Sequence, residues 1–98
     1  MLTLKKGYWI IQAQAIKDTD SMEMYSNLWA TFADKFQAKI ITATTSIQVV
    51  EGGDASRVTL VEFPSYEMAI DCYESTEYQN AKKYALQAMD RSLIVFEC

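Results

Sequence analysis

Residues 40–65 read IITATTSIQVVEGGDASRVTLVEFPS and decide the fold. The first part of this stretch is rich in Ile, Thr and Val, residue types that are favoured in β-strands. The Glu-Gly-Gly-Asp segment at 51–54 holds two of the three glycines in the chain, and glycine pairs mark turns. Residues 57–63 return as a second strand, which Pro64 ends because proline cannot donate to a strand ladder. This pattern predicts a β-hairpin over residues 40–63.

The residues that precede the hairpin predict a strand followed by a helix. Residues 7–16 present two largely apolar faces at a period of two, as expected for a central strand. Over residues 22–36, large apolar side chains recur at steps of three and four, which indicates an amphipathic helix that ends near Ala38. We expect Asp20 to cap this helix, with Glu23 completing a capping box.

The residues that follow the hairpin predict a second helix and a last strand. Ser65 is placed to cap a helix that buries Ala69 and Cys72. Ser75 begins a second capping sequence, so we expect the helix to bend there and then continue. Residues 93–96 are apolar and predict a short final strand.

The predicted order of elements is therefore β, α, β, β, α, β. Right-handed crossovers and short connections favour a four-stranded antiparallel sheet with both helices on one face. This is an α+β arrangement of the ferredoxin-like type. The length of 98 residues suits one domain and is too short for two, so we expect a single domain over 1–98 with a flexible tail at about 1–5.

Composition and charge exclude several classes of function. The net charge is −4 and no basic run is present, so we expect neither nucleic-acid binding nor binding to an anionic membrane surface. No segment has the roughly 20 apolar residues of a membrane span. Cys72 and Cys98 form no disulfide framework, which favours a cytoplasmic protein whose core thiol is Cys72 and whose Cys98 lies in a frayed end.

The chain lacks the residues of several common catalytic sites. It contains no histidine, which excludes a Ser-His-Asp triad, a Cys-His pair and a histidine-rich metal site. It has no glycine-rich phosphate loop. Asp71, Glu74 and Glu77 recur every three residues, which is typical of a solvated helix face. We therefore expect no metal and no cofactor.

Polar and aromatic side chains provide candidates for a ligand site. Glu62 lies among apolar residues near the end of its strand, so it needs either a partner, for which Gln12 is suitable, or a raised pKa. Trp29, Tyr73 and Tyr78 could line a small-molecule pocket or fill the core. Glu62 and Gln12 could likewise form a polar spot in that pocket or a structural hydrogen-bonded pair. These five residues are the candidate ligand-binding residues.

The face of the sheet that the helices leave open is predicted to be apolar. Tyr8, Ile10, Val58 and Leu60 are the candidate interface residues on this face, and Leu93 and Val95 are expected to join them. An exposed apolar patch of this extent favours association. A two-fold axis lets one such patch cover a second copy of itself, so we expect a homodimer.

The chain resembles the family of domains of unknown function DUF1330, within the dimeric α+β barrel superfamily. The resemblance rests on Lys-Gly-Tyr-Trp-Ile at 6–10, Val-Glu-Gly at 50–52, Arg-Val at 57–58 with Glu-Phe-Pro-Ser at 62–65, and Cys-Tyr-Glu-Ser-Thr-Glu-Tyr-Gln at 72–79 with Ala-Lys at 81–82. It implies a ferredoxin-like fold whose sheets pair face to face across a two-fold axis.

The sequence also departs from the family pattern. Members often have His or another polar group in place of Gln12, Arg-Gly-Gly in place of the Ala-Thr-Thr at 43–45, and Arg in place of Ala85. Positions that could hold a pocket cation or base are therefore neutral in this chain.

Three functions fit these observations. The first is a homodimeric module that binds a small apolar or aromatic molecule in a pocket between sheet and helices. The second is a cofactor-independent enzyme, similar to a monooxygenase or isomerase, that acts on a small aromatic substrate. The third is a structural module that binds another protein. The size of the pocket separates the first two functions from the third, because a ligand site requires a few hundred Å³.

Overall fold

The predicted hairpin is present as two antiparallel strands, β2 (Lys39–Thr44) and β3 (Arg57–Phe63). β2 ends at Thr44, earlier than the predicted end at residue 50. The Thr44 hydroxyl accepts a hydrogen bond from the amide of Ser46 at 3.0 Å, and this local turn replaces the next ladder bond. Residues 45–56 therefore form a long loop and not a tight turn.

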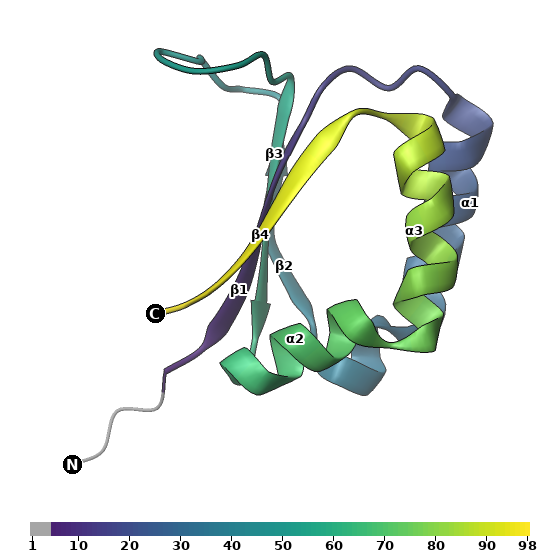
Figure 1. Ribbon diagram of the computed structural model, residues 1–98, viewed down its shortest axis with the longest axis vertical. Coiled ribbons are helices and arrows are strands. Elements are labelled where there is room, and N and C mark those ends of the chain that lie inside the picture. Colours follow the sequence, from purple (N-terminus) through teal and green to yellow (C-terminus); the bar gives the residue numbers. More distant parts are fainter. Residues whose placement is uncertain (1–4) are drawn as a thin grey trace.

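The remaining elements follow the predicted order in this computed structural model, which describes residues 5–98. They are β1 (Gly7–Ala13), α1 (Thr19–Phe32), the 3₁₀ helix η1 (Ala33–Phe36), α2 (Tyr66–Glu74), α3 (Thr76–Ala88) and β4 (Arg91–Glu97). The strands form one antiparallel sheet in the order β2-β3-β1-β4, and all helices lie on the same side of it (Figure 1). The ferredoxin-like α+β fold is confirmed.

The first helix starts and ends earlier than predicted. Asp18, and not Asp20, is its N-cap: the Asp18 carboxylate accepts from the amide of Ser21 at 3.2 Å and from its hydroxyl at 2.8 Å. The α-helix ends at Phe32 and tightens into η1. Gln37 then turns the chain with a left-handed φ of 54°.

Serine hydroxyls begin both later helices, as predicted. The Ser65 hydroxyl accepts from the amide of Met68 at 3.1 Å, and the Ser75 hydroxyl accepts from the amide of Tyr78 at 3.0 Å. Ser75 is extended, with ψ of 151°, so the chain breaks there into two helices. α3 then packs beside α1, and both run along the sheet (Figure 1).

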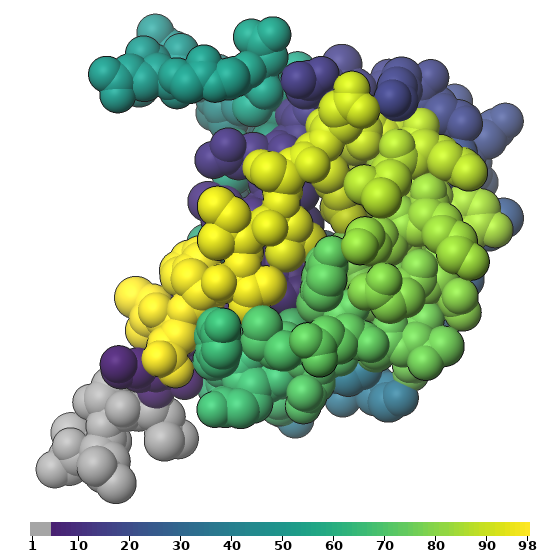
Figure 2. Space-filling view, in the orientation of Figure 1, coloured from purple at the N-terminus to yellow at the C-terminus, as the bar shows by residue number. Residues whose placement is uncertain are grey.

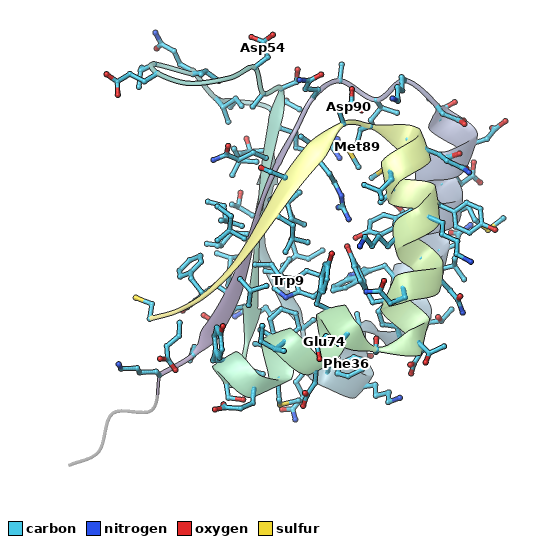
Figure 3. The ribbon with its side chains drawn as sticks, in the orientation of Figure 1. Trp9, Phe36, Asp54, Glu74, Met89 and Asp90 are labelled. Atoms are coloured by element: carbon cyan, nitrogen blue, oxygen red, sulfur yellow. The ribbon has the colours of Figure 1, made fainter. Side chains whose placement is uncertain are left out.

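The core lies between the sheet and the helices and is centred on Trp9. Its indole is fully buried and donates to the carbonyl of Ala69 at 3.0 Å. Its ring lies 4.9 Å from that of Tyr78 and 5.1 Å from that of Phe63. Figure 3 shows Trp9 projecting from the sheet toward the helices. These aromatic rings fill part of the space between the two layers.

The last strand has a different register from the one predicted. Leu93 lies opposite Ile11 and Val95 lies opposite Trp9, so both face the helices and pack against the core. The prediction that they lie on the open face is wrong, because a shift of one residue exchanges the two faces of a strand. Ile94 and Phe96 occupy the open face in their place.

The ends of the described chain are paired. The backbones of Lys6 and Cys98 exchange two hydrogen bonds, at 3.1 Å and 3.0 Å, which extend the ladder between β1 and β4. The prediction that Cys98 frays is therefore wrong, although its side chain is exposed. Most of the predicted flexible tail, residues 1–4, lies outside the described residues.

Candidate functional site

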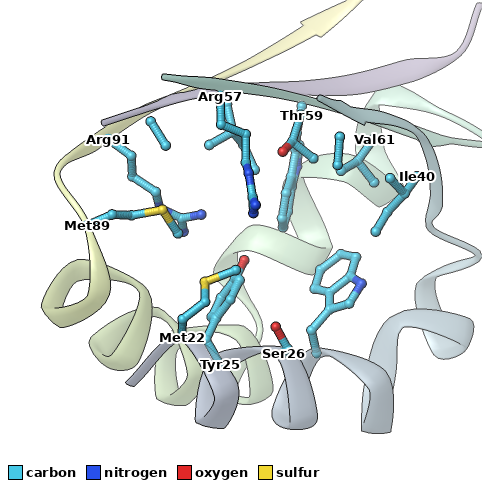
Figure 4. A pocket seen from close by; sticks show the side chains of 14 residues that line it. Met22, Tyr25, Ser26, Ile40, Arg57, Thr59, Val61, Met89 and Arg91 are labelled. Atoms are coloured by element: carbon cyan, nitrogen blue, oxygen red, sulfur yellow. The ribbon is translucent and has the colours of Figure 1, made fainter. Parts of the chain in front are cut away.

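A cavity of about 300 Å³ lies between the sheet and α1 (Figure 4). The period of two in β1 and β3 places Trp9, Ile11 and Val61 on the sheet face that lines it. The helical period in α1 places Tyr25 and Trp29 on the opposite wall. The lining is therefore mainly apolar and aromatic, as is common in small-molecule sites.

Two arginines extend into this cavity, and they are the only arginines of the chain. Arg57 begins β3 and Arg91 begins β4. Both lie directly opposite Ala13 of β1, one on each side of it. Figure 4 shows the two side chains reaching from the strands toward the middle of the cavity, with the Tyr25 hydroxyl facing them.

Arg91 is held by two tyrosines. Its guanidinium lies 5.1 Å from the centre of the Tyr25 ring, a cation–π contact. Its Nη2 donates to the hydroxyl of Tyr78 at 2.5 Å, and the hydroxyls of Tyr78 and Tyr25 are 3.3 Å apart. Burial, followed by the neighbouring Tyr25, raises the pKa of Tyr78 far above its ordinary value. Tyr78 is therefore a fixed, neutral partner of Arg91.

Neither arginine has a carboxylate partner within residues 5–98. The ion pairs of this part of the chain are Lys6–Glu62, Lys17–Asp90 and Lys35–Glu77. Within the described residues, no Asp or Glu lines the cavity. The site thus combines an apolar wall with two uncompensated positive charges.

The predicted ligand-binding residues are distributed over several places. Trp29 lines the cavity. Tyr78 is fully buried behind the cavity and contacts lining residues of both walls, namely Trp9, Tyr25, Trp29 and Arg91. Tyr73 borders a smaller hollow of about 120 Å³, where the Lys82 ammonium lies 5.1 Å from its ring centre.

Gln12 and Glu62 lie on the other face of the sheet and do not line this cavity. Gln12 is exposed and stands opposite Val58, so the prediction that it pairs with Glu62 is wrong. Glu62 accepts from Lys6 Nζ at 3.2 Å and from the Tyr8 hydroxyl at 3.0 Å. These hydrogen bonds, first from Lys6 and then from Tyr8, lower the pKa of Glu62, whereas an unpaired buried acid would have a raised one.

Neither cavity arginine was predicted from the sequence. The inference that the pocket positions are neutral was drawn from residues 12, 43–45 and 85. Arg57 was noted only as part of the Arg-Val motif at 57–58, and Arg91 was not considered. The available signal was the alternation in β3, which places Arg57 on the same face as Val61. For Arg91 no such signal existed, because the predicted last strand began only at Leu93.

The part of the chain that the structure describes has neither a metal centre nor a membrane-spanning helix. Over residues 5–98, no group of three His, Cys, Asp or Glu side chains is placed to hold a metal ion. None of the helices in this range has the length and hydropathy needed to cross a membrane.

Comparison with solved structures shows the same fold in proteins of different sequence. A protein of unknown function from Rhodopseudomonas palustris is similar at a TM-score of 0.72 and 14% identity, over 96% of this chain and 82% of that one. A dimeric ferredoxin-like protein of unknown function from Thermobifida fusca is similar at 0.64 and 8%, over 100% and 95%. SnoaB, a cofactor-independent oxygenase from Streptomyces nogalater, is similar at 0.57 and 8%, over 94% and 89%.

Comparison of sequences identifies the family. No curated protein matches the chain. The family model for the domain of unknown function DUF1330 matches residues 6–98, which include every strand and helix described above. This protein therefore belongs to the DUF1330 family, within the ferredoxin-like fold.

Proposed function

We propose that this protein is a small homodimeric domain that binds an aromatic or apolar molecule in the cavity between its sheet and α1. The observation that carries the proposal is the cavity itself. Its volume of about 300 Å³ is at the lower end of the range for small-molecule sites. Both tryptophans of the chain line it, and aromatic walls of this kind favour a flat apolar ligand.

A screen of small metabolites by thermal shift tests this function, because a ligand that binds the native state raises its melting temperature. Ser26 lies on α1 at the cavity, and the variant Ser26→Trp fills the space in front of it. Asn27 is the next residue and is exposed, so Asn27→Trp is the matched control. Ligands should stabilise the wild type and Asn27→Trp but not Ser26→Trp. Equal stabilisation of all three proteins would contradict binding in this cavity.

The second candidate function is a cofactor-independent enzyme that acts on a small aromatic substrate. Two positive charges in a cavity could stabilise a substrate anion, which favours this candidate. The lining, however, contains no carboxylate or thiol to accept a proton. Cys72 lies in the core, where burial raises the pKa of its thiol to about 12. We therefore rank binding first. Oxygen uptake with 1-naphthol above the rate without protein would reverse this order.

The open face of the sheet supports the homodimer. It carries the four candidate interface residues Tyr8, Ile10, Val58 and Leu60, together with Ile94 and Phe96. Ile94 is 56% exposed, and Phe96 stacks on Tyr8 with ring centres 5.3 Å apart. A contiguous apolar sheet face of this kind is a typical association surface.

The loop over residues 45–56 adds an arm to this surface. It projects beyond the open face of the sheet, on the side away from the helices, and leaves a hollow beneath it (Figures 1 and 2). Val49 and Val50 on this arm are 43% and 82% exposed. A second copy packed on the sheet face would lie within reach of these valines. A two-fold axis would then place the arm of each subunit beside the sheet of its partner.

The structural comparisons support a homodimer. The proteins from Bacteroides fragilis and Thermobifida fusca that share this fold are described as dimeric. A module that binds a different protein is the third possibility. In that case the isolated chain would have the mass of one subunit, 11.2 kDa, in solution.

A further inference from the structure

We infer that the ligand of the cavity is a small aromatic acid whose carboxylate binds between Arg57 and Arg91. This inference rests on the proposed function and names the chemical class of the ligand. It follows from the position of the two guanidinium groups, from their lack of a counter-ion and from the apolar walls around them.

The register of the sheet brings the two charges together. Arg57 and Arg91 flank Ala13, so the three residues form one row across β3, β1 and β4. Ala13 is buried and its side chain is a single methyl group, which leaves space in front of it between the longer side chains. Both arginines are only partly exposed, and Figure 4 shows them entering the same cavity.

The two charges are not compensated by the described part of the chain. Two like charges that face one partly desolvated space disfavour each other, and an anion placed between them removes that cost. The protein as a whole is acidic, with 13 Asp and Glu residues, yet none of them lines the cavity. Guanidinium groups pair with carboxylates through two parallel hydrogen bonds, which makes a carboxylate the matching anion.

Tyr25 and Tyr78 orient Arg91 toward the space where an anion would bind. Arg91 donates one N–H to Tyr78 and rests against the Tyr25 ring, so its orientation is fixed while its other N–H groups remain available. When an anion occupies the cavity, Tyr78 can donate to Tyr25, and Tyr25 can then donate its own proton to the ligand. The chain Arg91–Tyr78–Tyr25 thus aims hydrogen-bond donors at the same space as Arg57.

The remainder of the cavity suits an aromatic body. Beyond the arginines, the lining is mainly apolar: it consists of aromatic rings, thioethers and aliphatic side chains, with the hydroxyls of Ser26 and Thr59 as its other polar groups besides Tyr25. The aromatic rings include Trp9 and Trp29, and the thioethers belong to Met22 and Met89. Aromatic rings and methionine sulfur pack well on a flat ring system. A volume of about 300 Å³ suits one or two fused rings better than a larger ligand.

A pair of matched probes tests the inference on the full chain: 2-naphthoate, and 2-naphthamide, which has the same shape without the charge. Because Trp9 and Trp29 line the cavity, quenching of tryptophan fluorescence reports occupancy, and calorimetry confirms the affinity. We expect 2-naphthoate to bind at least about tenfold more tightly than 2-naphthamide, since hydrogen bonds to charged groups are the strong ones. Higher salt should weaken the binding of 2-naphthoate only.

Arg57→Met is the decisive variant, because Arg57 forms no ion pair within residues 5–98 and its loss leaves the tyrosine network intact. It should remove the preference for 2-naphthoate, while Lys83→Met, at an exposed position of α3, should keep it. Equal binding of the two probes by the wild type would overturn the carboxylate inference and leave the proposed function standing. A preference retained in Arg57→Met would overturn the assigned site. Failure of both probes to bind would overturn the inference and the proposed function together.

Discussion

Arg57 and Arg91 lie on opposite sides of Ala13, and both extend into the cavity between the sheet and α1. The two arginines are 34 positions apart in the sequence (91 − 57). Only the pairing of β1 with both β3 and β4 brings them together. The strand order β2-β3-β1-β4 makes β1 the neighbour of both β3 and β4. The functional centre that we propose is therefore a direct consequence of the strand order.

The space in front of Ala13 provides the first prediction. Ala13→Val adds two methyl groups between the arginines, so we expect loss of 2-naphthoate binding by at least about tenfold and a stability loss of about 1–3 kcal/mol from overpacking. Titration and urea denaturation measure the two effects. Ala15→Val is the control, because Ala15 is exposed just beyond the end of β1. Unchanged binding in Ala13→Val would show that the ligand does not occupy this space.

The hydroxyl of Tyr78 provides the second prediction. Tyr78→Phe removes the acceptor of a hydrogen bond from Arg91, so we expect a loss of about 1.5–3 kcal/mol in the free energy of unfolding. Tyr66→Phe, at an exposed position, should have no such effect.

Alkaline pH provides an independent test of Tyr78. Its pKa in the folded state is raised above the unfolded value near 10, so its contribution to stability is complete below pH 10 and decreases as pH rises further. The variant Tyr78→Phe should lose less stability above pH 10 than the wild type. Parallel pH profiles would mean that Tyr78 is not protected by burial.

The fold could be predicted because its signals are local. The glycine pair at 52–53, the β-branched residues of the hairpin and the capping serines Ser65 and Ser75 each specify one element without reference to the rest of the chain. The order of those elements then limits the topology. The wrong helix cap has the same origin: Asp18 and Asp20 are equivalent locally, and the hydrogen bonds to Ser21 decide between them.

The candidate site could be predicted only in part, because it depends on register. Leu93 and Val95 were assigned to the wrong face, and that error hid Arg91, which shares their face. No local pattern in the sequence fixes how β4 aligns with β1. Trp29 was found because helical periodicity is local. The Glu62 partner was missed since Lys6 and Tyr8 lie more than fifty residues away in the chain.

Glu62 provides the third prediction. Hydrogen bonds from Lys6 and Tyr8 lower its pKa, so its contribution to stability is present above its ordinary pKa of 4.5 and is lost as pH falls below that value. Glu62→Gln should keep the fold at neutral pH and show a smaller loss of stability between neutral and acidic pH. Denaturation curves at several pH values measure this difference. Glu67→Gln, at an exposed position of α2, is the control.

The two thiols provide the fourth prediction. Burial raises the pKa of Cys72 to about 12, and thiols react through the thiolate, so Cys72 should label slowly in the native protein. Cys98 is exposed and should label rapidly, although its backbone is paired. Mass spectrometry after brief treatment with iodoacetamide should show one modified thiol, at Cys98. Rapid modification of Cys72 would mean that α2 opens in the native state.

The homodimer provides the last prediction. The open sheet face and the arm over residues 45–56 are the two parts of its proposed interface, and mutations can test each one separately. Light scattering after size exclusion should give a mass near twice 11.2 kDa for the wild type. Leu60→Asp places an unpaired carboxylate on the open sheet face, so it should yield monomers, because burying that charge in an interface costs several kcal/mol per ion. Val50→Asp changes only the arm and should weaken the dimer without altering the stability of the subunit, since Val50 is 82% exposed.

One control for this prediction lies in the loop, and a second test lies on the sheet face. Glu51 is exposed beside Val50, and Glu51→Gln should leave the dimer intact. Circular dichroism decides whether a monomeric Leu60→Asp is folded, and Ile94→Asp provides a second test on the neighbouring part of the face, where the wild-type side chain is already 56% exposed. A wild-type mass near 11 kDa would contradict the dimer outright. A dimer that survives Val50→Asp but not Ile94→Asp would mean that the sheet face alone holds the subunits together.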